Sequence, residues 1–523
     1  MGREPSWLFG QRNCTLSHRD FIVPDTKGLN IDMNWVTTPQ SSRIIDNEAI
    51  ASGIAPSVLM ETAAQGVVSH CADIPDGSAV VVLCGNGNNG GDGYAIARML
   101  STRCTVTIGA VPEPSTMSAE TLENYHRALQ LSIPVSIPDD VLAGTYDVVI
   151  DALIGTGGTA DLREPISRWT RLVNSKKAYV LSVDVPTGLD SATGRRHPDT
   201  VRADTTITME TIKLGMLTAG GREVCGTIHV VPIGAPPGLA RQHAIGSSLD
   251  TGDLRQLLPE RRSGTHKYTY GHVLVVAGNR AMRGAAALCA EAALRTGAGV
   301  VTLATDHPHP LLPREIMVVP LNQAEQMLGK VTTIVAGPGF GTDEDRLGML
   351  TRLLNNAHDI PRIIDADGLR CIPEMRGNMQ NCILTPHPGE FNQLCDALGL
   401  EHASKSAEIT SVVNTVRTLA SHLGCTVHLK SVPPVTVSGS DVRFCSTGNP
   451  ALATAGTGDV LAGMIAGLVA QGVLGIDAAS LGAYLHGLTA DVWVQSRAEE
   501  SMLAGDVIRL LGTVMKNNNE KGK

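Results

Sequence analysis

The stretch "LCGNGNNGGDGYAIARML" (83–100) decides how the first half of the chain is read. It continues the apolar run 79–84, which is typical of a buried strand, and its spacing from Tyr94 onward predicts a helix. The glycines and asparagines in between cannot build a core. In open parallel sheets, ligands bind beyond the carboxyl ends of strands, and the N–H groups at a helix start favour anions. The stretch therefore predicts a ligand-binding loop, in which Asp92 either faces the ligand or caps the helix.

Strand-like and helix-like segments alternate along the rest of the chain, which predicts largely parallel sheets with right-handed crossovers. The expected strands are 79–84, 104–110, 147–153, 178–186, 203–209, 226–234, 272–278, 332–337, 362–367 and 382–387. The pattern lapses in the Pro-, Gly- and Ser-rich segment 234–248 and then restarts, with small-residue helices expected at 284–299 and 456–472. We therefore predict an α/β protein with an N-terminal tail at 1–40, a first domain at 41–243 and a second domain at 244–523.

The amino-acid composition limits the kinds of molecule that the protein is expected to bind. Lys and Arg number 42 against 51 Asp and Glu, and the resulting net charge of −9 argues against nucleic acid. The cysteines include no C-x-x-C pair, so buried, reduced thiols and a cytoplasmic location are expected. No apolar run reaches the ~18–20 residues of a membrane span, so no membrane partner is expected. The Ala/Gly-rich helices would suit self-association as well as a core, and a homo-oligomer is expected.

Acidic residues follow three expected strands of the first domain. Asp151 and Asp184 come at strand ends, and Asp92 lies in the loop described above. Thr187 and a second Gly/Thr-rich loop (155–161) lie beside them in the sequence. Carboxylate, amide and hydroxyl oxygens suit a hard cation, and a carboxylate free of the cation could accept a proton in a cleft. The simpler interpretation is that each aspartate only caps a turn.

A comparable signal in the second domain is "ATAGTGD" (453–459), a small-residue turn that opens a long helix. Successive N–H groups at such a turn would bind phosphate, and Asp459 could act as a base on a hydroxyl beside that phosphate. The simpler interpretation is an acid that interacts favourably with the helix dipole. The segments 336–342 and 385–391 also follow strands, and we expect His387 in a loop.

These motifs carry a family resemblance. "GNGNNGGDG", "DALIGTG" and "DVPTGLD" resemble the NAD(P)H-hydrate epimerase domain over nearly all of 41–243. "GHVLVVAGN", "AGPGFGT", "LTPHPGEF" and "NPALATAGTGDVLAG" resemble the ADP-dependent NAD(P)H-hydrate dehydratases of the ribokinase-like superfamily, from about 250 to 512. The resemblance implies a Rossmann-like three-layer α/β/α domain followed by a ribokinase-like α/β domain. The two activities commonly occur fused in this order.

The resemblance also implies a function, which is repair of hydrated NADH and NADPH. The first half would interconvert the R and S hydrates (NADHX and NADPHX). The second half would dehydrate the S form with ADP, giving AMP and phosphate. Asp184 would handle the proton in the first half, and Asp459 would be the base in the second. K⁺ would serve the epimerase half, and ADP with Mg²⁺ the dehydratase half.

Further roles carry over residue by residue. The implied substrate-binding residues are Asn88, Asn89, Gly90, Gly91, Asp92, Gly155, Thr156, Gly157, Gly158, Thr159, Ala160, Asp161, Asp184, Ala285, Gly339, His387 and Asp459. The implied nucleotide-binding residues are Lys430, Ser431, Val432, Pro433, Pro434 and Gly458. The implied potassium ligands are Asn89, Asp151 and Thr187.

The chain departs from the family pattern at two places in its second half. Tyr268 replaces the glycine of a His-Lys-Gly motif, and the prolines of "KSVPP" (430–434) remove backbone donors beside the nucleotide. Two alternatives stay open at this point. One is a ribokinase-like kinase of a vitamin precursor with a non-catalytic, nucleotide-binding N-terminal half. The other is a binding protein without catalysis.

Overall fold

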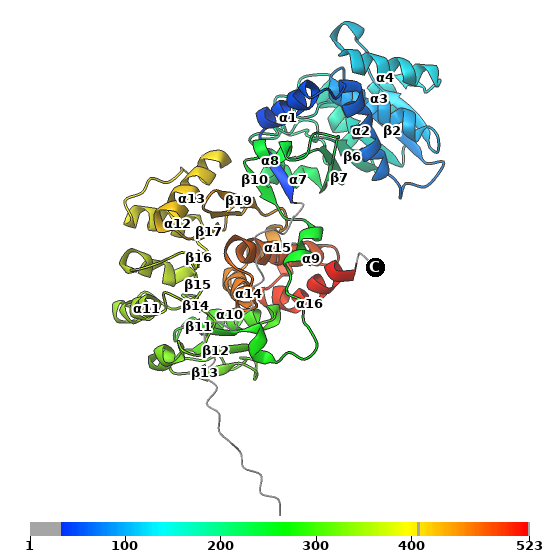
Figure 1. Ribbon diagram of the computed structural model, residues 1–523. Helices are drawn as coiled ribbons and strands as arrows, with labels where there is room; N and C mark the ends of the chain where they lie inside the picture. Colours follow the sequence, from blue (N-terminus) through cyan, green and yellow to red (C-terminus); the bar gives the residue numbers. More distant parts are fainter. Residues whose placement is uncertain (1–32, 405–407, 521–523) are drawn as a thin grey trace, which may run out of the picture.

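The computed structural model describes residues 33–404 and 408–520 and folds them into two α/β units (Figure 1). The first unit is built around a parallel sheet whose strands run in the order β4-β3-β2-β5-β6-β7-β9. Its strands are β2 (Ala79–Cys84), β3 (Thr105–Gly109), β4 (Val135–Ser136), β5 (Val148–Ala152), β6 (Tyr179–Val183), β7 (Thr205–Met209) and β9 (Thr227–Val231). Its helices are α1 (Pro39–Ala51), α2 (Pro56–Ser69), α3 (Asn88–Leu100), α4 (Ala119–Gln130), α5 (Pro138–Val141), α6 (Ile166–Asn174), α7 (Ala219–Cys225) and α8 (Leu239–His243).

Alternation along the strands builds an apolar core on each face of this sheet. In β2, Val80 and Val82 pack on the face that α2 and α3 cover. Val81 and Leu83 point to the opposite face, where they pack with Trp169 of α6. A strand that is buried on both faces has a continuous run of apolar residues, which is why "AVVVLC" could be predicted as a strand from the sequence.

The second unit repeats the layered plan with a longer sheet. Its strands are β10 (Gly246–Ser248), β11 (His272–Val276), β12 (Val300–Ala304), β13 (Met317–Val319), β14 (Thr333–Ala336), β15 (Arg362–Ile364), β16 (Cys382–Leu384), β17 (Thr426–Leu429), β18 (Val435–Ser438) and β19 (Asp441–Phe444). Its helices are α9 (Thr251–Leu257), α10 (Arg283–Thr296), α11 (Glu344–Asn356), α12 (Pro388–Ala397), α13 (Ile409–Leu423), α14 (Thr457–Ala470), α15 (Gly475–Val494) and α16 (Ala504–Glu520). The 3-10 turns η2 (Leu214–Leu217), η5 (Ala366–Glu374) and η6 (Pro450–Leu452) are used below.

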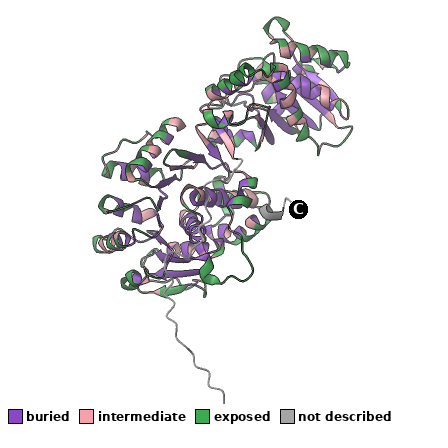
Figure 2. Cartoon of the chain, in the orientation of Figure 1, coloured by how far each residue is buried: buried purple, intermediate pink, exposed green. Residues whose placement is uncertain are grey.

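Helices cover both faces of the second sheet, and Figure 2 shows the buried residues gathered between the layers. Alternate residues of β11 separate the two cores. Leu274 and Val276 pack with α11, α12 and α13, whereas Val273 and Val275 pack with α10, α14, α15 and α16. The expectation of two α/β units with largely parallel sheets is confirmed. The antiparallel pairs of this sheet are β17 with β18, β18 with β19, and β1 with β10.

Short strands join the two units. Strands β1 (Asn34–Thr37), β8 (Ile212–Lys213) and β10 continue the second sheet beyond β19, in the order β19-β10-β1-β8. We expected 34–37 to lie in an N-terminal tail, but in the structure this segment is a paired strand. The difference has a physical reason, because four residues gain strand structure from partners at 212–213 and 246–248, and no local signal encodes that pairing. The exact domain limits remain a prediction.

In each sheet the strand order reverses at one strand, and ligands commonly bind at such a switch point. In the first sheet, β2 is followed on one side by β3 and on the other by β5, and in the second sheet β11 lies between β12 and β14. Crevices open beyond the carboxyl ends of strands at such switch points. In the first unit, Asp151 lies near the carboxyl end of β5 and Asp184 directly follows β6, whereas Asp459 of the second unit lies in the first turn of α14.

The structure also bears on the expectations about cysteines and membranes. The ten cysteines within the described ranges are buried free thiols, as predicted. In the same ranges, no helix combines the length and the apolar character that crossing a membrane would require.

Candidate active sites

The glycine-rich stretch belongs mostly to a helix. We expected the helix to start at Tyr94, but α3 begins at Asn88, so the alternative that Asp92 caps a helix starting at Tyr94 is wrong. Asp92 lies within the second turn of α3 instead. Sequence reasoning missed this because glycine has low helix propensity, whereas here close packing requires it. A Cβ at Gly90 would lie 1.8 Å from the carbonyl oxygen of Gly85, and one at Gly85 would lie 2.0 Å from the carbonyl oxygen of Leu153.

This packing makes a prediction about Gly90. In Gly90→Ala the new methyl must displace the backbone of Gly85, which should destabilise the first unit by roughly 1–3 kcal/mol and reduce its activity. Gly87→Ala is the matched control, because a Cβ there meets nothing within 4 Å. Thermal unfolding of both variants measures the difference. Equal melting temperatures for the two would contradict the close approach.

Asp151 and Thr187 form the buried centre of the first site. The Asp151 carboxylate accepts hydrogen bonds from the Thr187 hydroxyl at 2.7 Å and the Thr187 N–H at 2.9 Å. It also accepts from the Ser182 hydroxyl at 3.0 Å and the Leu153 N–H at 3.3 Å. Burial raises the pKa of Asp151, and these hydrogen bonds oppose the rise. The structure therefore brings two of the three predicted potassium ligands into direct contact.

The third predicted potassium ligand, Asn89, lies at the same edge of the sheet. In the amide orientation that suits its neighbours, it donates to the Val183 carbonyl at 3.2 Å and accepts from the Gly155 N–H at 3.3 Å. A Cβ at Gly155 would lie within 3.0 Å of both Asn89 and Asp184, so only glycine fits between them. The two glycine-rich loops thus meet at the switch point. The remaining loop residues, Gly157, Gly158, Thr159, Ala160 and Asp161, follow at the surface or partly buried.

Asp184 occupies a strained position at the end of β6. Its φ is +67°, in the left-handed region that costs energy for residues other than glycine and that clusters at functional sites. Its carboxylate accepts from the Thr156 N–H at 2.8 Å, from the Thr156 hydroxyl, and from the Thr208 hydroxyl at 3.2 Å. The Lys213 ammonium lies 2.7 Å from the same carboxylate. The backbone thus aims one carboxylate into a fixed polar cage.

Lys213 is the main residue that sequence reasoning missed. It lies on the short strand β8 and is buried, with its three donors directed at Asp184, the Thr208 hydroxyl and the Met209 carbonyl. Burial alone would raise the pKa of Asp184, but the Lys213 charge and the hydrogen bonds lower it below its ordinary value. A lysine inside the apolar run "TIKLGML" (211–217) was the available signal.

Other acids surround this cage. Burial raises the pKa of Asp92 well above its ordinary range, and the charges of Asp184 and Asp46 raise it further. Asp46 on α1 and Glu210 after β7 also have raised pKa values through burial, and both interact with Lys213. Sequence reasoning named neither Asp46 nor Glu210. The first site is therefore a cluster of acids with Lys213 as a buried positive charge.

Lys213 allows a prediction about pH. Lys213→Met removes the charge that lowers the pKa of Asp184 but keeps a side chain of similar length, so burial should raise that pKa. If epimerisation needs ionised Asp184, the acid limb of its pH–rate profile should move up by about 1–3 pH units. Lys213→Arg keeps the charge and should move the limb less. An unmoved limb in Lys213→Met, with the protein folded, would contradict the pairing.

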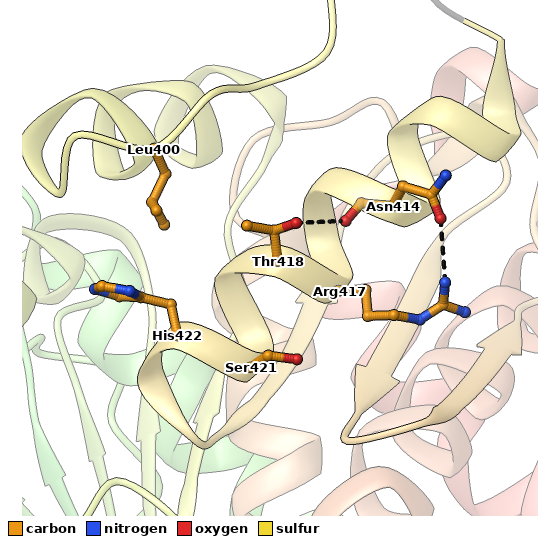
Figure 3. A pocket seen from close by; sticks show the side chains of 6 residues that line it. All are labelled: Leu400, Asn414, Arg417, Thr418, Ser421 and His422. Atoms are coloured by element: carbon orange, nitrogen blue, oxygen red, sulfur yellow. Dashed lines mark hydrogen bonds between the residues drawn. The ribbon is translucent and has the colours of Figure 1, made fainter.

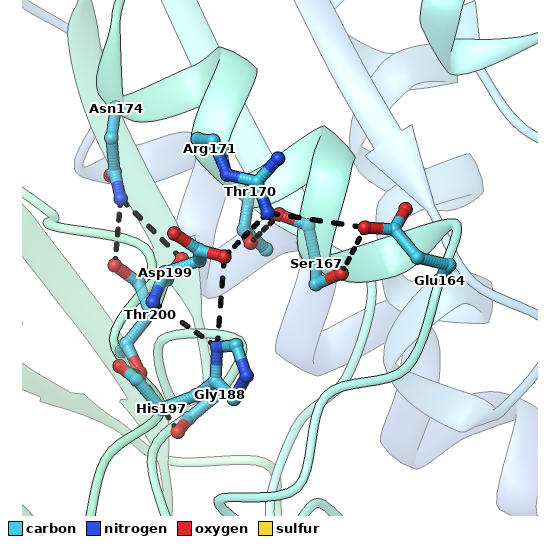
Figure 4. A network of polar contacts seen from close by, with 9 residues as sticks. All are labelled: Glu164, Ser167, Thr170, Arg171, Asn174, Gly188, His197, Asp199 and Thr200. Carbon is cyan, nitrogen blue, oxygen red and sulfur yellow. Dashed lines mark hydrogen bonds and ion pairs between the residues drawn. The ribbon is translucent and has the colours of Figure 1, made fainter.

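A polar network supports the segment that follows Thr187 (Figure 4). The Thr200 hydroxyl donates to the Gly188 carbonyl at 2.8 Å, and Asn174 donates to the Thr200 carbonyl at 2.8 Å. Arg171 of α6 pairs with Asp199 at 2.8 Å. These bonds tie the loop after β6 to α6, and so fix the backbone that presents Thr187.

The second site is centred on the first turn of α14. Gly456, at φ +91°, precedes the helix, and Asp459 lies in its first turn, as predicted. His486 of α15 donates to the Thr457 carbonyl at 3.0 Å and so fixes the position of the first turn of α14. Burial raises the pKa of Asp459 to about 7, the charge of Asp365 adds to the rise, and Lys430 opposes it. A carboxyl with this pKa can act as a base near neutral pH.

Lys430 and Asp365 form a buried pair beside this turn. Lys430 follows β17 and Asp365 follows β15, and their charged atoms lie 2.7 Å apart. Burial would lower the pKa of Lys430, but Asp365 reverses the effect and raises it. A Cβ at Gly458 would lie 3.3 Å from the Lys430 ammonium, which brings together two predicted nucleotide-binding residues. Asp365 was not predicted, although it lies within the expected strand 362–367.

The rest of the predicted nucleotide loop has few free donors. The Ser431 hydroxyl donates to the Pro433 carbonyl at 2.7 Å, and its N–H donates to the Leu429 carbonyl at 2.9 Å. Pro433 and Pro434 have no N–H to offer. Within this loop, therefore, Val432 and the Lys430 ammonium are the groups left to meet a nucleotide.

The predicted hydrate-binding residues of the second half lie near this turn. Gly339, at φ +55°, packs on α10, where a Cβ would lie 2.8 Å from that of Ala285. Helix α10 packs against α14, and its Leu288 would meet a Cβ on Gly456 at 2.7 Å. The expectation that His387 lies in a loop is confirmed, because His387 is the last residue of the segment 385–387 that connects β16 with α12. His387 is the N-cap of α12, where its Nδ1 accepts from Gly389 and Glu390 while a carboxylate oxygen of Glu390 accepts from its N–H.

A surface hollow on α13 lies apart from the predicted residues. It is lined by Leu400, Asn414, Arg417, Thr418, Ser421 and His422 (Figure 3). None of these is a predicted site residue, and none carries a carboxylate. The chemistry is therefore better assigned to the acidic clusters around Asp184 and Asp459.

Comparison with known proteins agrees with this two-site arrangement. A family model described as NAD(P)H-hydrate dehydratase matches residues 273–512, and one described as YjeF-related protein N-terminus matches 56–215. In solved structures, the chain resembles the ADP/ATP-dependent NAD(P)H-hydrate dehydratase from Bacillus subtilis, with 28% identity, a TM-score of 0.43, and coverage of 52% of this chain and 98% of that chain.

Curated relatives match both units together. The bifunctional NAD(P)H-hydrate repair enzyme Nnr of Coxiella burnetii is 32% identical over 476 residues, which cover 89% of this chain and 96% of the relative. The protein of the same name from Escherichia coli strain K12 is 32% identical over 472 residues, covering 88% and 90%. With this similarity along nearly the whole length, the chain belongs to the family of bifunctional NAD(P)H-hydrate repair enzymes.

Proposed function

We propose that the chain repairs hydrated NADH and NADPH at two sites. The first site interconverts the R and S hydrates, and the second dehydrates the S hydrate at the expense of ADP. The observation that carries the proposal is the presence, in one chain, of two acidic sites, one in each of the regions that the two family models match. Each site holds one acid whose environment suits proton transfer, Asp184 in the first unit and Asp459 in the second.

In the first site, Asp184 would accept a proton from the substrate and return it while the configuration at the hydroxyl-bearing carbon inverts. Lys213 keeps this carboxylate ionised at neutral pH, which is the form that accepts a proton. Gly87 before α3 and Gly157 in the second glycine-rich loop have open surroundings, which would let the dinucleotide backbone approach. The N–H groups at the start of α3 would face its phosphates.

In the second site, Asp459 would remove the proton from the ring hydroxyl of the S hydrate. The hydroxyl oxygen then attacks the terminal phosphorus of ADP, and AMP leaves. Elimination then breaks the C–O bond of the resulting phosphate ester and a C–H bond of the neighbouring ring carbon, whose proton passes to water. This restores the ring double bond and releases inorganic phosphate. The N–H groups at the start of α14, with Gly458 and Lys430, would hold the charge that develops on the phosphate.

The state of Asp459 makes a prediction about pH. Burial disfavours the charged form and raises the pKa of Asp459 to about 7. The carboxyl is therefore mostly ionised, and able to act as a base, only above that pH. In the wild-type protein, dehydration measured as kcat/KM for the S hydrate should rise with pH along a limb with its midpoint near 7. A rate that stays constant between about pH 5.5 and 8.5 would contradict the base role.

Cations are proposed for both sites. The oxygens of Asn89, Asp151 and Thr187 are of the type that binds K⁺, which would supply a fixed positive charge beside the loops. Among the described residues, no group of three His, Cys, Asp or Glu side chains is arranged to hold a metal. We therefore propose that Mg²⁺ enters the second site bound to the ADP phosphates. Self-association of the chain remains a prediction.

The test of this function separates it from the kinase alternative. Purified protein is incubated with the S hydrate of NADH and ADP, and separately with hydroxymethylpyrimidine as a vitamin precursor. The proposal expects one AMP, one phosphate and one NADH for each hydrate consumed. A stable phosphorylated product from the vitamin alcohol, with no NADH from the hydrate, would favour a kinase instead. The bifunctional relatives make that alternative the less favoured one.

A further inference from the structure

A single arginine of the first unit reaches into the second. Arg222 lies on α7, which packs beside the short strand β8 through η2. Its guanidinium donates to the carbonyls of Thr447 and Gly448, both at 2.9 Å, and to that of Cys445. Its Nε donates to the Leu217 carbonyl at 3.0 Å, which anchors the side chain within its own unit. The planar guanidinium of Arg222 thus donates hydrogen bonds to four backbone carbonyls.

The segment that Arg222 holds leads directly to the turn before Asp459. Residues 445–449 connect β19 with η6, and the segment 453–458 follows η6 without a break. Gly448 has φ +102° in this connection. This segment is also held by α15, since the Gly448 N–H and the Asn449 amide donate to the Asp491 carboxylate, both at 2.9 Å. Arg222 and Asp491 therefore clamp the same short segment.

The clamp continues into the turn itself. Asn449 caps η6 by accepting from the Ala451 N–H at 3.1 Å. The Thr457 hydroxyl then donates back to the Leu452 carbonyl, at the end of η6, at 2.9 Å. A displacement of 445–449 would pass through these bonds to the N–H groups at the start of α14. Those are the groups proposed above to hold phosphate.

From this geometry we infer that Arg222 is a positioning residue for the second active site, supplied by the first unit. It makes the phosphate-holding turn of the dehydratase half depend on a side chain of the epimerase half. The inference rests on the proposed dehydration reaction, but it does not follow from that reaction, because Arg222 touches neither substrate. A guanidinium suits this task because its donors form a rigid fork, whereas an ammonium is a point charge on a flexible stem.

The test uses the full-length chain with Arg222→Met, Arg222→Lys and a matched control. Arg196→Met is the control, since Arg196 pairs with Glu223 on the same helix α7 but does not reach 445–449. We expect Arg222→Met to raise the KM for ADP about tenfold, since charged hydrogen bonds to the segment are lost, with a smaller fall in kcat. Arg222→Lys should recover part of the loss. Arg196→Met should match the wild type, and the R/S interconversion rate should stay unchanged in every variant.

A second measurement does not depend on turnover. Hydrogen exchange of the backbone amides in 445–458 should speed up in Arg222→Met and remain at the wild-type rate in Arg196→Met. Wild-type KM and wild-type exchange in Arg222→Met would overturn the inference, as would an equal loss of both activities, which indicates general destabilisation. A wild-type protein that does not dehydrate the S hydrate would instead refute the proposed function. The two failures are therefore distinguishable.

Discussion

Asp459→Asn is expected to lower the rate of S-hydrate dehydration by a factor on the order of 10²–10⁴, the usual contribution of a positioned general base. The amide is nearly isosteric but cannot accept the hydroxyl proton. Because Asp459 is at the start of α14 and its burial raises its pKa, the neutral amide should also cost the fold little. The measurement is NADH formation from purified S hydrate with ADP at pH 8, where the wild-type carboxyl is ionised.

The control for this prediction addresses the simpler interpretation of Asp459 as a helix-dipole acid. Glu120 lies in the first turn of α4, in the other unit, and Glu120→Gln removes a comparable helix-start charge. That variant should lose at most ~1 kcal/mol of stability and none of the dehydration rate. If Asp459→Asn behaved like Glu120→Gln, Asp459 would be a structural acid and the proposed chemistry of the second site would fall.

Asp184→Asn is expected to lower R/S interconversion by a similar factor, on the order of 10²–10⁴, while S-hydrate dehydration continues at the wild-type rate. Asparagine is the informative substitution because it tolerates the left-handed backbone at φ +67°, where alanine would add strain. It also keeps an acceptor for the Thr156 N–H.

The assay for Asp184→Asn starts from pure R hydrate with ADP present. Wild-type protein should form NADH after a lag, as R is converted to S, and the variant should form almost none. Adding S hydrate to the variant should restore NADH formation at once, which shows that the second half is intact. Wild-type conversion of R hydrate by Asp184→Asn would remove this aspartate from the mechanism.

Much of the fold could be read from the sequence because the strands are buried on both faces. "AVVVLC" (79–84) and "VLVV" (273–276) are apolar without interruption, so the positions of these strands and the parallel sheets could be predicted directly. The acids near the ends of such strands could also be predicted, because the apolar runs show where the strands end. Asp151, Asp184 and Asp459 stand at strand ends or a helix start, where parallel topology brings ligand-facing groups together.

The residues that sequence reasoning missed depend on contacts between distant segments. Lys213 contacts Asp184 from the short strand β8, which pairs with the distant β1, and two residues of strand carry no periodicity. Helix α3 includes Gly90 because the Gly85 carbonyl approaches it closely, a packing requirement that overrides helix propensity. Arg222 reaches across 223 residues of sequence to Cys445, and no local pattern marks that contact.

The measurement that tests the central claim most directly uses an equal mixture of R and S NADH hydrates with excess ADP. Recovery of NADH absorbance is followed to completion with wild-type protein. Two working sites in one chain predict complete conversion of the mixture, with a fast phase for the S form and a slower phase for the R form. Recovery that stops at the S portion would contradict the first site, and no recovery at all would contradict the second.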